Sequence, residues 1–206
     1  MNQTTPQANN PLHGVTLEHI VRTLQAAADK DAALEVRLAA LFHDIGKATT
    51  RRIDAKGHVT FHCHELVGAK MVDRIQTRLR FFGDDTSMFR NVRLLVQYHL
   101  RPASFKESST DHAVRRFIVD CDESGDRGFM NKLITLSRAD ITSKRPGRRQ
   151  AALRSISELS SRIAALRAHA GNQQWQRGGD LAHAFDFGRV GGAHHQAELA
   201  VEVPGA

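Results

Sequence analysis

The sequence predicts an all-α domain, a helical bundle with one small insertion. Apolar residues recur at three- and four-residue steps along most of the chain, which is the spacing of one helical face. Strand-like alternation is almost absent, and only the segment near residues 51–61 breaks the helical period. With 41% hydrophobic and 25% charged residues, the 206-residue chain can bury one core of ordinary composition, which excludes a wholly disordered chain.

The period predicts about seven helices, the first beginning near Val15. Gly46 is expected as the C′ residue of the second helix, Pro102 closes the fourth, and Asp111 is expected to cap the fifth. The apolar positions of the seven helices, in chain order, are Leu17, Ile20, Val21 and Leu24; Leu34, Leu38, Leu41 and Phe42; Val67, Met71, Val72, Ile75 and Leu79; Val92, Leu95, Val96 and Leu100; Val114, Phe117, Ile118 and Cys121; Leu133, Ile134 and Leu136; and Leu153, Ile156, Leu159, Ile163 and Leu166.

The segments outside these helices have their own composition. Residues 51–61 are expected to form a small hairpin or an ordered loop, because apolar residues flank Asp54-Ala55-Lys56-Gly57. Residues 1–12 are rich in Asn, Gln, Thr and Pro and are expected to be a disordered leader. Residues 169–206 are Gly-rich and are expected to be a poorly ordered tail, which leaves the domain at residues 13–168.

Composition also excludes several classes of protein. Two cysteines, Cys63 and Cys121, exclude a disulfide framework and favour a reducing, cytoplasmic location. No apolar run is long enough to span a membrane, so no membrane partner is expected. The formal net charge of +7 suits a polyanionic partner.

The chain has 12 histidines, and several of them, with two aspartates, fall at helix ends or on apolar helix faces. These residues are His19, His43, Asp44, His62, His64, His99 and Asp140. Any one buried histidine is more often a satisfied core residue than a ligand, but the combination favours a metal site. Imidazole and carboxylate without thiolate suit Mn, Fe, Ni, Co, Zn or Mg. A metal ion held by two imidazole nitrogens and two carboxylates would keep coordination positions open for water and substrate, as a hydrolytic metal site requires.

The strings around these residues resemble a known family. The set His19, His43-Asp44 and Asp140 resembles the metal-binding signature of the HD-domain phosphohydrolase superfamily. Within it, the chain is similar to the HD module of bacterial CCA-adding tRNA nucleotidyltransferases over about residues 12–168. The strings that carry this similarity are Leu-Phe-His-Asp-Ile-Gly-Lys-Ala-Thr at 41–49, Phe-His-Cys-His-Glu at 61–65, and Arg-Ala-Asp-Ile-Thr-Ser-Lys at 138–144.

The resemblance implies an HD-domain helical bundle and a role for each matching residue. The implied metal ligands are His19, His43, Asp44 and Asp140, with His64 and His99 as further ligands of a binuclear centre. The implied cofactor is one or two divalent metal ions, and Asp44, a catalytic residue, would be able to bridge two of them. Lys47 is the implied catalytic residue that binds the substrate phosphate beside Asp44. Arg138 is a second phosphate candidate. His62 and His64 share a face, so the sequence leaves open which of them ligates.

The implied activity is metal-dependent hydrolysis of phosphomonoesters or phosphodiesters in nucleotides or RNA, including tRNA. The CCA-adding enzymes carry a nucleotidyltransferase head that nothing upstream of His13 supplies, so the chain is expected not to add nucleotides alone. A separate head is a candidate partner. The basic run that would contact an RNA backbone comprises Arg138, Lys144, Arg145, Arg148 and Arg149.

Two other interpretations remain open. One is a non-catalytic tRNA-binding fragment or partner subunit of a tRNA nucleotidyltransferase, in which the basic run binds RNA and no chemistry occurs. The other is a regulatory hydrolase of the (p)ppGpp type, which fits the metal residues but not the flanking strings. The same basic run is also compatible with a solvated helix face.

Overall fold

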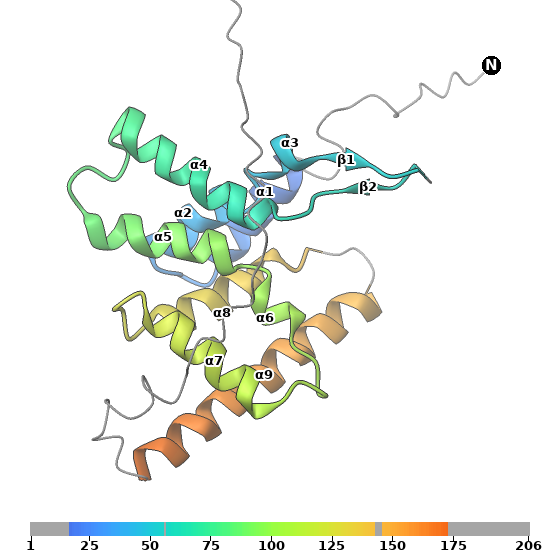
Figure 1. Cartoon of the computed structure of the whole chain (residues 1–206), viewed down its shortest axis with the longest axis vertical. Coiled ribbons are helices and arrows are strands. Elements are labelled where there is room, and N and C mark those ends of the chain that lie inside the picture. Colours follow the sequence, from blue (N-terminus) through green and yellow to red (C-terminus); the bar gives the residue numbers. More distant parts are fainter. Residues whose placement is uncertain (1–16, 56, 143–145, 173–206) are drawn as a thin grey trace, which may run out of the picture. The chain divides into compact units, whose positions relative to one another are not determined.

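The structure is a computed structural model that describes residues 17–55, 57–142 and 146–172 (Figure 1). The chain divides into two units, residues 1–168 and 169–206, and of the second only residues 169–172 are described. The predicted all-α class is confirmed, because the described residues form seven helices of nine residues or more. None of the described helices combines the length and the apolar character that crossing a membrane requires.

The helices and strands follow the predicted order. The longer helices are α1 (Leu17–Ala28), α2 (Leu34–Phe42), α4 (His64–Leu79), α5 (Thr86–Tyr98), α7 (Asp111–Asp122), α8 (Phe129–Asp140) and α9 (Pro146–Asn172). The shorter elements are α3 (Lys47–Thr50), α6 (Arg101–Ser104), β1 (Arg52–Ile53) and β2 (Val59–Thr60). The strands pair antiparallel, with Arg52 opposite Thr60, which confirms the expected hairpin. It projects from the helices (Figure 1).

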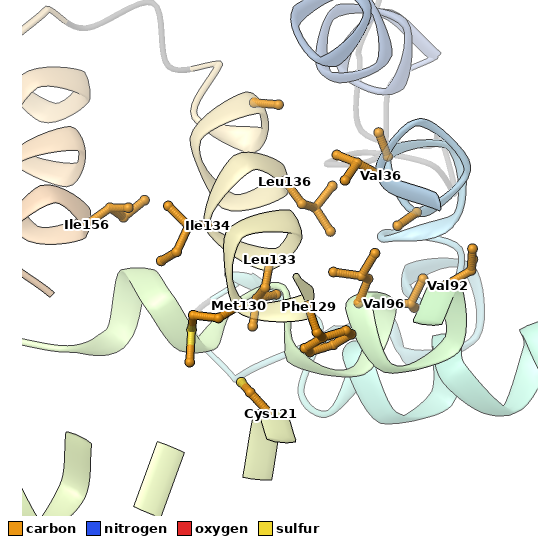
Figure 2. Packing of buried hydrophobic residues seen from close by; sticks show 14 of the residues in the cluster. Val36, Val92, Val96, Cys121, Phe129, Met130, Leu133, Ile134, Leu136 and Ile156 are labelled. Carbon is orange, nitrogen blue, oxygen red and sulfur yellow. The ribbon is translucent and has the colours of Figure 1, made fainter. Parts of the chain in front are cut away.

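Helix α8 lies at the centre of the packing, since it contacts α1, α2, α5, α6 and α7. It is therefore apolar on more than one face. In Figure 2, Leu136 points toward Val36 of α2, whereas Ile134 points the other way, toward Ile156 of α9. All four side chains belong to the buried core. Because Asp140 is the last residue of α8, this packing also determines the position of the Asp140 carboxylate.

Three expectations about helix ends need correction. The cap of α7 is Thr110, not Asp111, because the Thr110 hydroxyl accepts a hydrogen bond from the backbone N–H of Ala113. Pro102 lies in the first turn of α6, where its missing N–H would have no helical partner, while α5 already ends at Tyr98. Helix α9 continues to Asn172, so the first four residues of the predicted tail are helical. The rest of that tail and the predicted leader lie outside the described residues.

Gly46 has a different role from the one expected. Helix α2 is capped by His43, and Gly46 has ordinary helical backbone (φ −69°) directly before α3. A Cβ on Gly46 would overlap the backbone carbonyl oxygen of His64 and lie 2.7 Å from the backbone nitrogen of Gly68. Glycine is required at position 46 because two backbone segments approach closely there. A left-handed backbone conformation at Gly46 is not the reason. This approach holds the turn after α2 against the first turn of α4.

We expect Gly46→Ala to lower the free energy of unfolding by about 3 kcal/mol, because the added methyl group must displace backbone rather than a flexible side chain. Urea unfolding followed by circular dichroism measures the change. The matched control is Gly147→Ala in α9, where an added Cβ meets nothing within 4 Å. Its expected change is within about 0.5 kcal/mol. Equal stability of the two variants would contradict the close approach.

Candidate metal centre

Six of the residues singled out in the sequence meet where the ends of five helices converge. They are His19 in the first turn of α1, His43 and Asp44 after α2, His64 at the start of α4, His99 after α5 and Asp140 at the end of α8. The hydrophobic core packs these helices side by side, and their polar ends therefore gather in one place.

The six side chains form two groups of three. The ligand atoms of His19, His43 and Asp140 lie within 4.8 Å of one another, and so do those of Asp44, His64 and His99. The carboxylate of Asp44 joins the two groups. Its Oδ2 is 3.4 Å from Nε2 of both His19 and His43, and its Oδ1 is 3.4 Å from Nε2 of His64. We call these six residues the Asp44 cluster.

The local backbone resolves which histidine of the 61–65 string faces this cluster. Cys63, directly before α4, adopts a left-handed conformation with φ +58°. His64 then turns inward and is buried, while His62 is exposed. The sequence could not distinguish them, because the choice depends on one backbone dihedral angle.

Three of the imidazoles are oriented by their own helix ends. Nδ1 of each donates a hydrogen bond to the backbone carbonyl oxygen of the residue three positions earlier. The pairs are His43 with Ala40 at 2.8 Å, His64 with Phe61 at 2.8 Å and His99 with Val96 at 2.7 Å. A carbonyl oxygen only accepts, so Nδ1 carries a proton in all three rings, and Nε2 presents a lone pair wherever the ring is neutral.

Two of these lone pairs face a carboxylate. Nε2 of His64 and Nε2 of His99 are buried without a hydrogen-bond partner in the described part of the chain. They lie 3.4 Å and 4.0 Å from Oδ1 of Asp44. Burial, reinforced by the neighbouring His43, lowers the pKa of His99 to about 4, so that ring carries no second proton at neutral pH. Facing acceptors of this kind fit a cation placed between them.

On the other side of Asp44, the two carboxylates of the cluster hydrogen-bond to the imidazoles of His19 and His43. Burial opposes protonation of His43, but its hydrogen bonds with Asp140 and Asp44 prevail and raise its pKa to about 10. Hydrogen bonds with Asp140 and then with Asp44 raise the pKa of His19. Burial alone would raise the pKa of both aspartates, yet their hydrogen bonds with His19 and His43 hold it well below its usual range. Both carboxylates are therefore charged and attract a cation.

Exposure is unequal across the Asp44 cluster. His43, Asp44 and His99 are at most 2% exposed. The side chains of His19 and Asp140 are 20% and 22% exposed. Solvent therefore reaches the cluster on the side formed by α1 and α8.

Lys47 lies beside the Asp44 cluster, as its position three residues after Asp44 suggested. Its ammonium donates a hydrogen bond to Oδ2 of Asp44 at 2.7 Å and lies 5.7 Å from the centre of the Phe61 ring. Its side chain is 18% exposed. It opens α3 directly after Gly46, so the close approach of that glycine to α4 also positions this ammonium.

The other basic candidates lie elsewhere. Arg138 reaches Ser157 of α9, with Nη2 3.4 Å from the hydroxyl oxygen, and it lies about 200° around α8 from Asp140. Arg148 and Arg149 are exposed near the start of α9. Lys144 and Arg145 lie outside the described residues. The structure thus brings Lys47, and not Arg138, to the cluster.

One contact of the cluster was missed in the sequence. The hydroxyl of Thr142 lies 2.8 Å from Nδ1 of His19, although 123 residues separate them. The backbone N–H of Thr142 donates to the carbonyl oxygen of Asp140 at 2.8 Å. No spacing rule links residues so far apart, and only the packing of α1 against α8 reveals the pair.

Comparison with known proteins finds similarity to tRNA nucleotidyltransferases and CCA proteins. Three similar proteins are the A-adding tRNA nucleotidyltransferase of Deinococcus radiodurans and the multifunctional CCA proteins of Pseudomonas paraeruginosa and Herminiimonas arsenicoxydans. They are 35%, 34% and 32% identical over 107, 97 and 127 residues. The alignments cover 52%, 43% and 54% of this chain but only 22%, 22% and 30% of the relatives.

The comparison confirms the resemblance found in the sequence motifs. Residues 16–145 match the family model described as HD domain. That range contains all six residues of the Asp44 cluster. HD domains bind divalent metals, and the buried imidazoles and carboxylates here can hold one. The chain belongs to the HD domain family.

Proposed function

We propose that the chain is a metal-dependent phosphohydrolase that acts on phosphomonoesters or phosphodiesters of nucleotides or RNA. The observation that carries the proposal is a buried carboxylate between two groups of imidazoles, with two buried Nε2 atoms that lack a hydrogen-bond partner among the described residues. A buried polar atom left unpaired destabilises a fold by about 1–3 kcal/mol. A bound cation removes that penalty.

In this proposal Asp44 is shared by the two groups of the cluster. His19, His43 and Asp140 would hold one divalent ion together with Asp44, and His64 and His99 would hold a second one. Nitrogen and oxygen ligands without thiolate admit Mn, Fe, Co, Ni, Zn or Mg. A bound phosphate oxygen and a water molecule would approach from the side of His19 and Asp140, the most exposed side chains of the cluster. A divalent ion there supplies Lewis acidity and lowers the pKa of a water molecule toward neutrality.

The side chains around the ions then have separate tasks. The ammonium of Lys47 counters negative charge on the phosphoryl oxygens, and its low exposure of 18% keeps solvent from screening that charge. His43 and His99, both fully enclosed, keep bulk water away from the inner side of Asp44. The substrate enters on the partly exposed side of the cluster, at His19 and Asp140.

We expect purified wild-type protein to hold one or two divalent ions per chain and to hydrolyse members of a phosphoester panel. The panel contains 2′,3′-cyclic nucleotides, nucleoside monophosphates and short RNA. Asp44→Ala should lose both the metal and the rate, because it removes the carboxylate shared by both groups. Elemental analysis by mass spectrometry and steady-state rates measure these two outcomes.

The matched control is Asp84→Ala, which makes the same change at an exposed carboxylate paired with Arg80. It should retain wild-type metal content and rate. Wild-type protein without bound metal, or Asp44→Ala with an unchanged rate, would refute the proposed function.

For Lys47→Met we expect kcat to fall about 100-fold, because a preorganised positive group opposite the phosphoryl charge is lost. Metal content should stay at the wild-type level, since Lys47 does not ligate the ions. Lys47→Arg should recover part of kcat. A Lys47→Met enzyme with wild-type kcat would show that this ammonium only neutralises Asp44.

Non-catalytic binding of tRNA is the second candidate function. Arg148, Arg149 and Arg154 are exposed along the first turns of α9. No acidic residue occurs between Asp140 and Glu158 in the sequence. The names of the similar proteins refer to tRNA and CCA. An exposed basic stretch of this kind binds a phosphate backbone by releasing counterions.

If this stretch contacts RNA, a variant with both Arg148→Ala and Arg149→Ala should reduce the slope of log affinity against log salt by about 2. Fluorescence anisotropy with labelled tRNA between low and moderate salt measures the slope. The matched control has Arg115→Ala and Arg116→Ala, at an exposed pair on α7. It should leave the slope of log affinity against log salt unchanged. Wild-type affinity that does not vary with salt would contradict RNA binding by this stretch.

A further inference from the structure

We infer that Thr142 is a positioning residue of the metal centre, whose hydroxyl orients the imidazole of His19 toward the Asp44 cluster. The inference rests on the proposed metal binding and deepens it. It assigns a role to a residue that touches no ion and that the ligand motif does not include.

The first step is a difference among the four histidines. Nδ1 of His43, His64 and His99 donates to a backbone carbonyl oxygen of the preceding turn. Nδ1 of His19 instead faces a side-chain hydroxyl from a distant segment, at 2.8 Å. A substitution cannot remove a backbone carbonyl, but it can remove this hydroxyl.

The second step is the geometry of the chain after α8. Thr142 stands two residues beyond the end of that helix, and its backbone N–H bonds to the carbonyl oxygen of Asp140. The turn therefore connects Thr142 to one ligand by its backbone and to another by its side chain. Nε2 of His19 lies 3.0 Å from Oδ1 of Asp140 and 3.1 Å from Nε2 of His43. The ring is thus held at one nitrogen by Thr142 while the other faces the cluster.

The third step is the chemistry of that contact. When the hydroxyl oxygen of Thr142 accepts the Nδ1 proton of His19, Nε2 presents its lone pair to a cation. Partners of this kind fix the tautomer and orientation of ligating imidazoles, and their loss lowers metal affinity about 10–100-fold. His19 is 20% exposed, so its ring is less confined by packing than the enclosed rings of His43 and His99.

The test is titration of the metal-free 206-residue chain with Co²⁺. The visible absorption of the bound ion and competition with a chelator measure the binding. We expect Thr142→Val to weaken the first Co²⁺ site about 10-fold and to change the shape of its absorption band. Thr142→Ser keeps the hydroxyl and should stay within about 2-fold of wild type. Thr77→Val is the matched control, because its exposed hydroxyl on α4 donates to the carbonyl oxygen of Asp73, away from the Asp44 cluster.

The outcomes separate this inference from the proposed function. Wild-type protein that binds no Co²⁺ overturns both. If wild type binds Co²⁺ and Thr142→Val binds it with equal affinity, the role of Thr142 is overturned, but the proposed metal binding is not. A Thr142→Ser variant as weak as Thr142→Val also overturns it, because the hydroxyl would then not be the cause. Urea unfolding of the metal-free variants detects any loss of fold, and if Thr142→Val does not fold, Thr142→Ala takes its place with the same expected result.

Discussion

A carboxylate buried to 2% exposure governs the arrangement of this domain's polar residues. A buried charge is tolerated only where partners surround it. Oδ2 of Asp44 accepts from Lys47 and faces His19 and His43, and Oδ1 faces His64 and His99. These partners come from α1, α3 and the ends of α2, α4 and α5. The helices must therefore converge at their ends, which is what their packing around α8 achieves.

The surroundings of Asp44 divide into a rigid part and an adjustable part. Backbone carbonyl oxygens hold the rings of His43, His64 and His99, and the backbone contact at Gly46 holds the turn after α2 against α4. On the opposite side, His19 and Asp140 are partly exposed. The protein itself therefore holds most of the candidate ligands in place, and solvent reaches the cluster from one side.

Much of the fold could be predicted from the sequence, because helical periodicity and the hairpin residues are local signals. The metal candidates were recognisable from residue type and from the string around His43-Asp44. Other features depend on tertiary contacts. A glycine after a helix is expected as a C′ residue, and nothing local shows that Gly46 instead meets the backbone of α4. The choice of His64 over His62 depends on one dihedral angle at Cys63, and the pairing of Thr142 with His19 spans 123 residues.

The central claim is that Asp44 is the shared ligand of a centre that holds one or two divalent ions. Anomalous scattering from a crystal of the purified protein, collected above and below the absorption edge of the bound metal, tests it most directly. We predict one or two peaks within ligand distance of Asp44, beside the group of His19, His43 and Asp140 or beside the pair of His64 and His99. Crystals grown with Mn²⁺ or Co²⁺ that show no anomalous peak within ligand distance of Asp44 would contradict the account.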